Sequence, residues 1–166
     1  MIERHFDNLK LYMNTLIKEG EASEKPPLLT KPRHGLGDWV SPDGNTPPEG
    51  ALIYYDCYFY RYVRMMADMA TVLGRTKDAA YYASLGAALK RQFNAHFFDD
   101  NEGCYYSTNR SAGFRQAPQA VALAFGLVPE ERAPRVVKRL VQDIQDRKGH
   151  IWTGILGMES VGDALW

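Results

Sequence analysis

Apolar residues recur along most of this chain at the three- and four-residue spacing of one helix face. The first such stretch has apolar residues at positions 2, 6, 9, 13, 16 and 17, and Gly20 ends it. Two longer stretches, over about 52–73 and 76–97, are separated by little more than Gly74. So short a connection predicts an antiparallel helical hairpin.

The same spacing predicts further helices over about 117–126, from Pro129 onward through 144, and from 155 onward. In the second of these, Pro134 fits only in the first turn, because proline has no backbone N–H to donate. The helices therefore come in pairs, with longer connections between the pairs. Paired helices stacked about an axis form an open solenoid or a closed toroid. No repeat of about 34 or 40 residues with a shared consensus is present, which argues against tetratricopeptide and HEAT arrays.

One short segment has the pattern of strands. Residues 97–106 predict a small β-hairpin that turns at Asn101–Gly103. Asp99 and Asn101 offer a calcium loop as the alternative, but Gly103 would occupy a ligand position and no closing glutamate follows. We therefore expect an all-α protein with one small β-hairpin.

Two connections have unusual composition. Residues 21–50 are rich in proline and glycine, and a loop of this length inside a domain is usually functional or disordered. It ends in Thr46-Pro47-Pro48-Glu49, where Thr46 and Glu49 predict a capping box at a helix start. The second connection, 149–154, contains a Gly-His pair and a tryptophan.

Composition excludes several classes of protein. Lys+Arg and Asp+Glu both number 20, so the formal net charge is zero and no basic field is available for nucleic acid or an anionic membrane surface. The two cysteines, Cys57 and Cys104, lack metal-ligand spacing, and we expect reduced thiols with no metal and no cofactor. No apolar run approaches the roughly 18 residues of a membrane span, and the N-terminus has no signal-peptide pattern. We expect a cytoplasmic protein.

Several strings resemble the catalytic domain of bacterial α-L-rhamnosidases. In chain order they are Gly37-Asp38-Trp39, the helix start at Thr46-Pro47, QAPQAVAL at 116–123, FGLVP at 125–129 and GHIWTGILG at 149–157. The resemblance implies part of an (α/α)6 toroid of six helical hairpins, with the sugar held in a funnel at one end. It also implies inverting hydrolysis of a terminal α-L-rhamnoside by two carboxyl groups that stand roughly 6.5–9.5 Å apart.

The resemblance covers nearly the whole chain, but the chain corresponds to only part of the family's domain. The family's acidic cluster with its general acid precedes the matched stretch, and its general base follows the Gly-His loop, so neither is visible here. We expect residues 1–166 to form about three of the six hairpins and to be inactive in isolation. Trp152 stands where a small residue is usual, and Pro118 lies inside the start of the helix that carries Gln116.

The loops supply the candidate substrate-binding residues. They are Asp38, Trp39, Gln116, His150 and Trp152. A tryptophan ring matches the C–H face of a pyranose, and a neighbouring carboxylate accepts hydrogen bonds from vicinal hydroxyls.

Each candidate also has a structural interpretation. Trp39 could anchor its loop while Asp38 caps nearby amides, His150 could cap a helix, Gln116 could satisfy a loop, and Trp152 could pack on the next helix. On the helix over 52–73, Tyr54 and Tyr58 either face the funnel or pack inside.

Two other functions remain open. The fold also suits another six-hairpin glycosidase, such as a glucuronyl hydrolase or a glucoamylase-like enzyme. A non-catalytic helical interaction module would separate Trp39 from His150 and leave their loops unconnected. Because half a toroid leaves two helical faces unsatisfied, we expect exposed apolar patches and self-association through them.

Overall fold

The computed structural model describes residues 2–22 and 36–166; the part of the predicted long loop over 23–35 lies outside these residues. The described residues form six α-helices, one two-stranded sheet and a short 3-10 helix. Their bounds are α1 Ile2–Glu21, α2 Leu52–Val72, α3 Thr76–Phe97, β1 Phe98–Asp99, β2 Cys104–Tyr105, η1 Arg110–Ala112, α4 Gln116–Ala124, α5 Ala133–Asp146 and α6 Ile155–Leu165. The predicted all-α fold with one small β-hairpin is confirmed.

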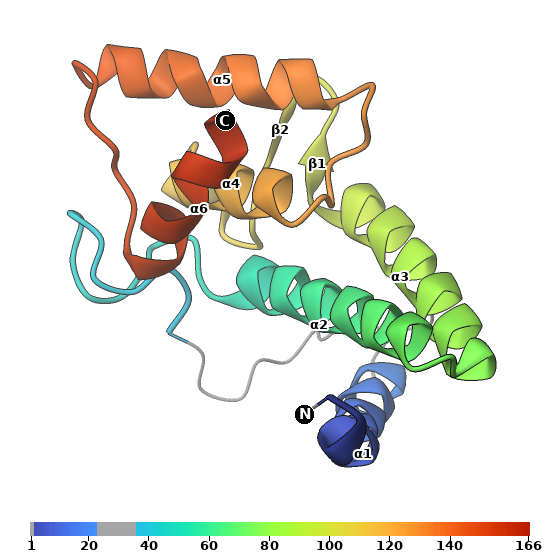
Figure 1. Cartoon of the computed structure of the whole chain (residues 1–166). Coiled ribbons are helices and arrows are strands. Elements are labelled where there is room, and N and C mark those ends of the chain that lie inside the picture. The colour runs from blue at the N-terminus through green and yellow to red at the C-terminus, as the bar shows by residue number, and fades with distance from the viewer. Residues whose placement is uncertain (1, 23–35) are drawn as a thin grey trace.

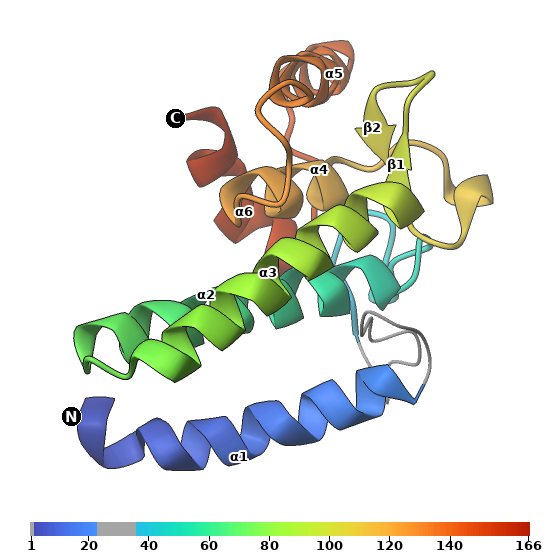
Figure 2. The same cartoon turned by 90° about the vertical axis from the view of Figure 1, so that its right-hand side faces the viewer.

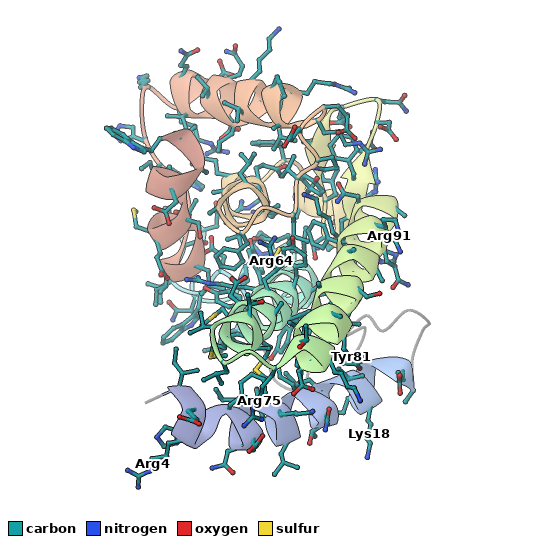
Figure 3. The ribbon with its side chains drawn as sticks, turned by 45° about the vertical axis from the view of Figure 1, so that its right-hand side comes forward. Arg4, Lys18, Arg64, Arg75, Tyr81 and Arg91 are labelled. Atoms are coloured by element: carbon teal, nitrogen blue, oxygen red, sulfur yellow. The ribbon has the colours of Figure 1, made fainter. Side chains whose placement is uncertain are left out.

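The first three helices lie side by side and alternate in direction (Figure 2). Gly74, at φ 68°, ends α2 in the left-handed conformation that favours glycine, and the next amide donates to the carbonyl of Ala70. Helix α1 is fastened to the α2–α3 connection. Arg75 pairs with Asp7 and its guanidinium lies 4.6 Å from the Phe6 ring centre, on the side of the connection that faces α1 (Figure 3).

Helix α4 lies at the centre of the second half, where it packs against α2, α5 and α6. Its buried Gln119 acts as a partner for strand β2: the amide oxygen accepts the Tyr105 N–H at 2.8 Å, and the amide nitrogen donates to the Tyr105 carbonyl at 2.7 Å. A second buried amide, Asn94 of α3, donates to the Leu127 carbonyl at 2.9 Å. Because these buried polar groups are paired, the hairpin and the α4–α5 connection are fixed in the core.

The β-hairpin has the predicted turn. Phe98 pairs with Tyr105, and Gly103 takes a left-handed conformation. The Asp99 carboxylate accepts the backbone N–H groups of Asn101 and Glu102 and an ion pair from Arg110. The turn interpretation of this segment is therefore confirmed.

Two predicted helix starts are wrong. Helix α2 begins at Leu52 and Ala51 precedes it without a side-chain cap, so Thr46 and Glu49 form no capping box. Glu49 is instead buried. Gly50, at φ 83°, interrupts any helical path from Glu49 to the start of α2 at Leu52. Helix α5 begins at Ala133 and not at Pro129, because turns occupy the residues between the two positions, and Pro134 does lie in its first turn.

Candidate functional site

The first residues of α2, α4 and α6 lie on one side of the molecule, together with the loop over 36–50 (Figure 1, left). Contacts between the segments that precede these helices confirm the arrangement. Arg115, before α4, pairs with Glu49, before α2, and Asp38 of the same loop bonds to Gly154, before α6. Three helix starts with their unpaired N–H groups thus meet at one end of the fold.

Asp38 caps helix α6. Its carboxylate is 1% exposed, and its two oxygens accept the N–H groups of Gly154 at 2.6 Å and Gly157 at 2.9 Å. The carbonyl of Trp39 accepts the N–H of Ile155 at 2.9 Å. A carboxylate is stabilising at a helix N-terminus, where it satisfies amides that lack partners within the helix. Of its two interpretations, the structure therefore favours the capping role for Asp38.

Two glycines, one before α6 and one in its first turn, allow close approach at this end of the helix. A Cβ at Gly154 would lie 2.3 Å from the carbonyl oxygens of both Asp38 and Trp39. A Cβ at Gly157 would lie 2.6 Å from Cβ atoms of Ala117 and Thr153. At Gly154, the Gly-Asp-Trp string and the Thr-Gly string thus form the two sides of one close packing contact, and Gly157 allows a second one with α4.

Trp39 remains available to a ligand, since its side chain is 39% exposed although its backbone is fixed. The next residue, Val40, has φ 59°, a conformation that is costly for a β-branched side chain. The Ser41–Gly44 turn that follows is closed by two backbone hydrogen bonds. The loop is therefore held in a strained conformation at the point where Trp39 projects, which is a common feature of functional sites.

A charged network lies beside this turn. Arg115 contacts Asp43 at 2.5 Å and Glu49 at 3.4 Å. Burial raises the pKa of Asp43, but hydrogen bonds from Arg115 and Trp152 outweigh it and hold that pKa below its ordinary value. Burial raises the pKa of Glu49 above its ordinary value, although the Tyr54 hydroxyl, at 2.5 Å, and Arg115 act in the opposite direction. The second carboxylate oxygen of Glu49 accepts no hydrogen bond from the described residues.

Gln116 joins the start of α4 to the loop before α6. Its amide oxygen accepts the backbone N–H of Trp152 at 2.8 Å, and its nitrogen donates to Asp143 at 2.8 Å and to the His150 carbonyl at 3.4 Å. Gln116 is buried, so the loop-satisfying interpretation applies to it. The His150 side chain is exposed and takes part in no hydrogen bond or ion pair within the described segments. Trp152 is half-buried, with its indole N–H 2.9 Å from Asp43.

The tyrosines of α2 behave differently from one another. Tyr54 is buried and its hydroxyl donates to Glu49, which matches the interior interpretation, although it also borders the groove that Tyr58 lines. Tyr58 is half-buried and lines a groove of about 430 Å³ between α1, α2 and the first turn of α6. The groove begins beside the Asp38 turn, since Leu36, Gly37 and Leu156 line the end nearest to it.

Sequence reasoning singled out Asp38 and Gln116, which connect the loops, but assigned them to substrate binding and missed the charged residues that support them. Asp43, Arg115 and Asp143 were not singled out, and Glu49 was assigned to a helix cap. One signal was present: Asp43 lies in the Pro/Gly-rich loop, and Arg115 directly precedes Gln116. No cluster of three or more metal-ligating side chains occurs in residues 2–22 and 36–166, and none of the helices there has the length and apolarity of a membrane span.

Comparisons with known proteins identify the family to which the chain is similar. The family model described as the bacterial α-L-rhamnosidase six-hairpin glycosidase domain matches residues 1–166. An α-L-rhamnosidase of Formosa agariphila is 35% identical over 133 residues, which cover 74% of this chain and 13% of that protein. An α-L-rhamnosidase of Streptomyces avermitilis is 30% identical over 129 residues, covering 78% of this chain and 11% of that protein.

Solved structures show the same fold. The α-L-rhamnosidase from Dictyoglumus thermophilum superposes with a TM-score of 0.86 at 28% identity, covering 99% of this chain and 17% of that one. The Streptomyces avermitilis α-L-rhamnosidase complexed with L-rhamnose superposes with a TM-score of 0.79 at 25% identity, covering 99% and 14%. The chain thus spans less than a fifth of the length of these relatives. It belongs to the bacterial α-L-rhamnosidase six-hairpin glycosidase domain family.

Proposed function

We propose that the protein carrying these 166 residues hydrolyses terminal α-L-rhamnosides with inversion, and that this segment forms about three of the six hairpins and one side of its sugar site. The observation that carries the proposal is the convergence of three helix starts with the loops that carry Trp39, Trp152 and His150. The fold matches a rhamnosidase complexed with L-rhamnose over 99% of this chain. In this proposal the two tryptophans and His150 contact the ligand, while Asp38 and Gln116 hold their loops in place.

The proposal places the catalytic acid and base outside these residues. Two carboxylates near the site, Asp38 and Asp43, are already engaged by backbone amides and by Arg115. Glu49 is buried beneath Tyr54 and Arg115 and is only 2% exposed. An inverting pair must reach the leaving oxygen and a water on opposite faces of the sugar. Asp38 and Asp43 are committed to other partners, and Glu49 is too deeply buried to reach either one.

The experiment compares the isolated chain with the full-length gene product on aryl α-L-rhamnoside, β-D-glucuronide and α-D-glucoside substrates. We expect the full-length protein to release the aryl group only from the rhamnoside, and the isolated chain to release none. Preference for the glucuronide or glucoside would support the other six-hairpin enzymes. Turnover by the isolated chain that Glu49→Gln abolishes would contradict the placement of the catalytic pair.

The contacts between the loops speak against the interaction module. That function requires unconnected loops, yet the Trp39 carbonyl accepts the Ile155 N–H at 2.9 Å and Asp38 accepts that of Gly154. The site proposed here depends on this connection.

We also propose that the isolated chain self-associates through α1 and α2. A second groove, of about 240 Å³, lies between these helices and shares Tyr12 and Tyr62 with the first. Both tyrosines and Met65 are exposed, so the two grooves form one continuous apolar surface. Apolar surfaces of this kind favour association, and two copies that pair the same surface would cover it on both.

A further inference from the structure

Trp152 is held at three separate points. Its backbone N–H donates to Gln116 at 2.8 Å, its indole N–H donates to Asp43 at 2.9 Å, and the guanidinium of Arg147 lies 5.0 Å from its ring centre. The guanidinium covers one face of the indole, and Asp43 occupies its N–H edge. The side chain is nevertheless only half-buried, so its exposed part is the opposite face or the remaining edge.

Two of these contacts share one support, and the third has another. A single oxygen of Asp143 accepts both Gln116, at 2.8 Å, and Arg147, at 2.9 Å. One carboxylate oxygen of Asp43 lies 2.5 Å from the Arg115 guanidinium, and the same oxygen accepts the indole N–H of Trp152. A loop tryptophan that served only to fill space would not need two layers of polar support.

Arg115 occupies the key position in this network. It immediately precedes α4, its side chain is only 10% exposed, and it lies between the carboxylates of Asp43 and Glu49 in the loop before α2. The adjacent Gln116 holds the loop before α6. Two consecutive residues therefore fix two loops that lie about 110 residues apart in the sequence, as the Asp43–Trp152 bond spans 109 positions. The planar guanidinium can serve two carboxylates at once, which a lysine ammonium does with less directional control.

We propose that Arg115 is a positioning residue that, through Asp43, sets the orientation of the Trp152 indole and so presents its free face to a ring of the bound glycoside. The inference rests on the proposed carbohydrate site and names a residue of that site that touches no substrate. An aromatic platform held in one orientation loses little entropy when a ring stacks on it, so loosening it weakens binding.

The test observes the indole N–H signals of the ¹⁵N-labelled chain, which has three tryptophans, Trp39, Trp152 and Trp166. Variants Trp39→Phe and Trp166→Phe assign the signals. We expect Arg115→Met to move the Trp152 signal and to raise its exchange with solvent about tenfold or more, because the indole loses a fixed acceptor. Arg115→Lys should give an intermediate result. Arg110→Met is the control. It removes another arginine–aspartate pair, in which the Arg110 guanidinium lies 2.7 Å from the Asp99 carboxylate in the β-hairpin, and it should leave the Trp152 signal unchanged.

A second variant protects the test against misfolding. Asp43→Ala removes the acceptor itself, and the dispersion of the backbone amide signals reports whether each variant is folded. A double variant combines Arg115→Met with Asp43→Ala. If Arg115 acts through Asp43, the Trp152 indole N–H of this double variant should exchange at the same rate as in Asp43→Ala alone. A Trp152 signal that Arg115→Met leaves in place, or effects of the two substitutions that add, would overturn the proposal.

Ligand titrations separate this proposal from the function on which it rests. L-rhamnose and p-nitrophenyl α-L-rhamnopyranoside are added to each folded variant. We expect the dissociation constant of the ligand that shifts Trp152 to rise roughly tenfold in Arg115→Met. A shift with L-rhamnose identifies the pyranose as the stacked ring, and a shift with the aryl glycoside alone identifies the aryl group. Arg115→Met could change the indole N–H signal of Trp152 while neither ligand shifts any tryptophan signal of the wild-type chain. That result would show that Arg115 orients the indole, and it would contradict the proposal that Trp152 presents a face to the ligand.

Discussion

The Asp38 carboxylate accepts the backbone N–H of Gly154 at 2.6 Å, across 116 positions of the sequence. This bond places the loop before α2 against the first turn of α6, and a second one, from Gly157, fixes its direction. Without it, the N-terminal amides of α6 would need other partners and the two loops would have no common anchor. The geometry of the proposed sugar site therefore depends on a capping interaction.

Gly154→Ala tests this close approach. The added methyl would meet two backbone carbonyl oxygens at 2.3 Å, and backbone cannot move aside as a flexible side chain does. We expect a loss of about 2–4 kcal/mol in the free energy of unfolding, measured by urea denaturation. Gly162→Ala is the control inside α6, the helix that Gly154 precedes, because a Cβ at Gly162 meets no atom within 4 Å. That substitution should stabilise the chain by about 0.5–1 kcal/mol. Equal effects at the two positions would contradict the described contact between the loops.

Glu49→Gln tests the environment of the buried Glu49 carboxyl group through the pH dependence of the free energy of unfolding. The folded-state pKa of Glu49 is raised above 4.5, so the folded chain binds this proton more tightly than the unfolded chain. Its contribution to stability is fully present below the unfolded pKa and is lost as pH rises through the folded value. The glutamine variant should therefore gain stability relative to wild type as pH rises from about 4 toward neutrality, as measured by urea denaturation at a series of pH values.

Asp43→Asn provides the control of opposite sign for that series. The folded-state pKa of Asp43 is lowered below 3.8, so its stabilising contribution is present above the unfolded pKa and is lost as pH falls through the folded value. The asparagine variant should lose stability relative to wild type as pH rises through the acidic range. If the two variants follow the same trend, the described environments of Glu49 and Asp43 are wrong.

Met65→Lys tests self-association of the isolated chain. A charge on the exposed surface of α2 should disfavour burial of the apolar grooves and shift the chain toward monomer in sedimentation velocity. Val72→Lys is the control, because Val72 is also exposed on α2 but lines neither groove. Wild-type chain that sediments as a monomer at every concentration, or variants that behave alike, would contradict association through this surface.

The helices could be predicted from sequence because each has a continuous apolar face and several end at glycine. Gly74 and Gly126 adopt the left-handed conformation at the ends of α2 and α4. The α2 start was placed too early because Thr46 and Glu49 have the spacing of a capping box, whereas tertiary contacts with Tyr54 and Arg115 bury Glu49 instead.

The site was only partly predictable for a related reason. The two loops were recognisable as special by composition, and their strings by resemblance. The contacts of Arg115 with Asp43, and of Asp43 with Trp152, join residues 72 and 109 positions apart, and no periodicity connects such positions. Charged residues in loops are common, so the few that form the network could not be distinguished before the fold was known.

The most direct measurement is a titration of the ¹⁵N-labelled chain with L-rhamnose, followed by the indole N–H signals of its three tryptophans. If the loops over 36–50 and 147–154 form one sugar-binding rim, the Trp39 and Trp152 signals should shift together with a single dissociation constant. The signal of the fully exposed Trp166 should remain in place. Shifts of Trp39 and Trp152 with different dissociation constants, or a response of neither, would contradict a common site.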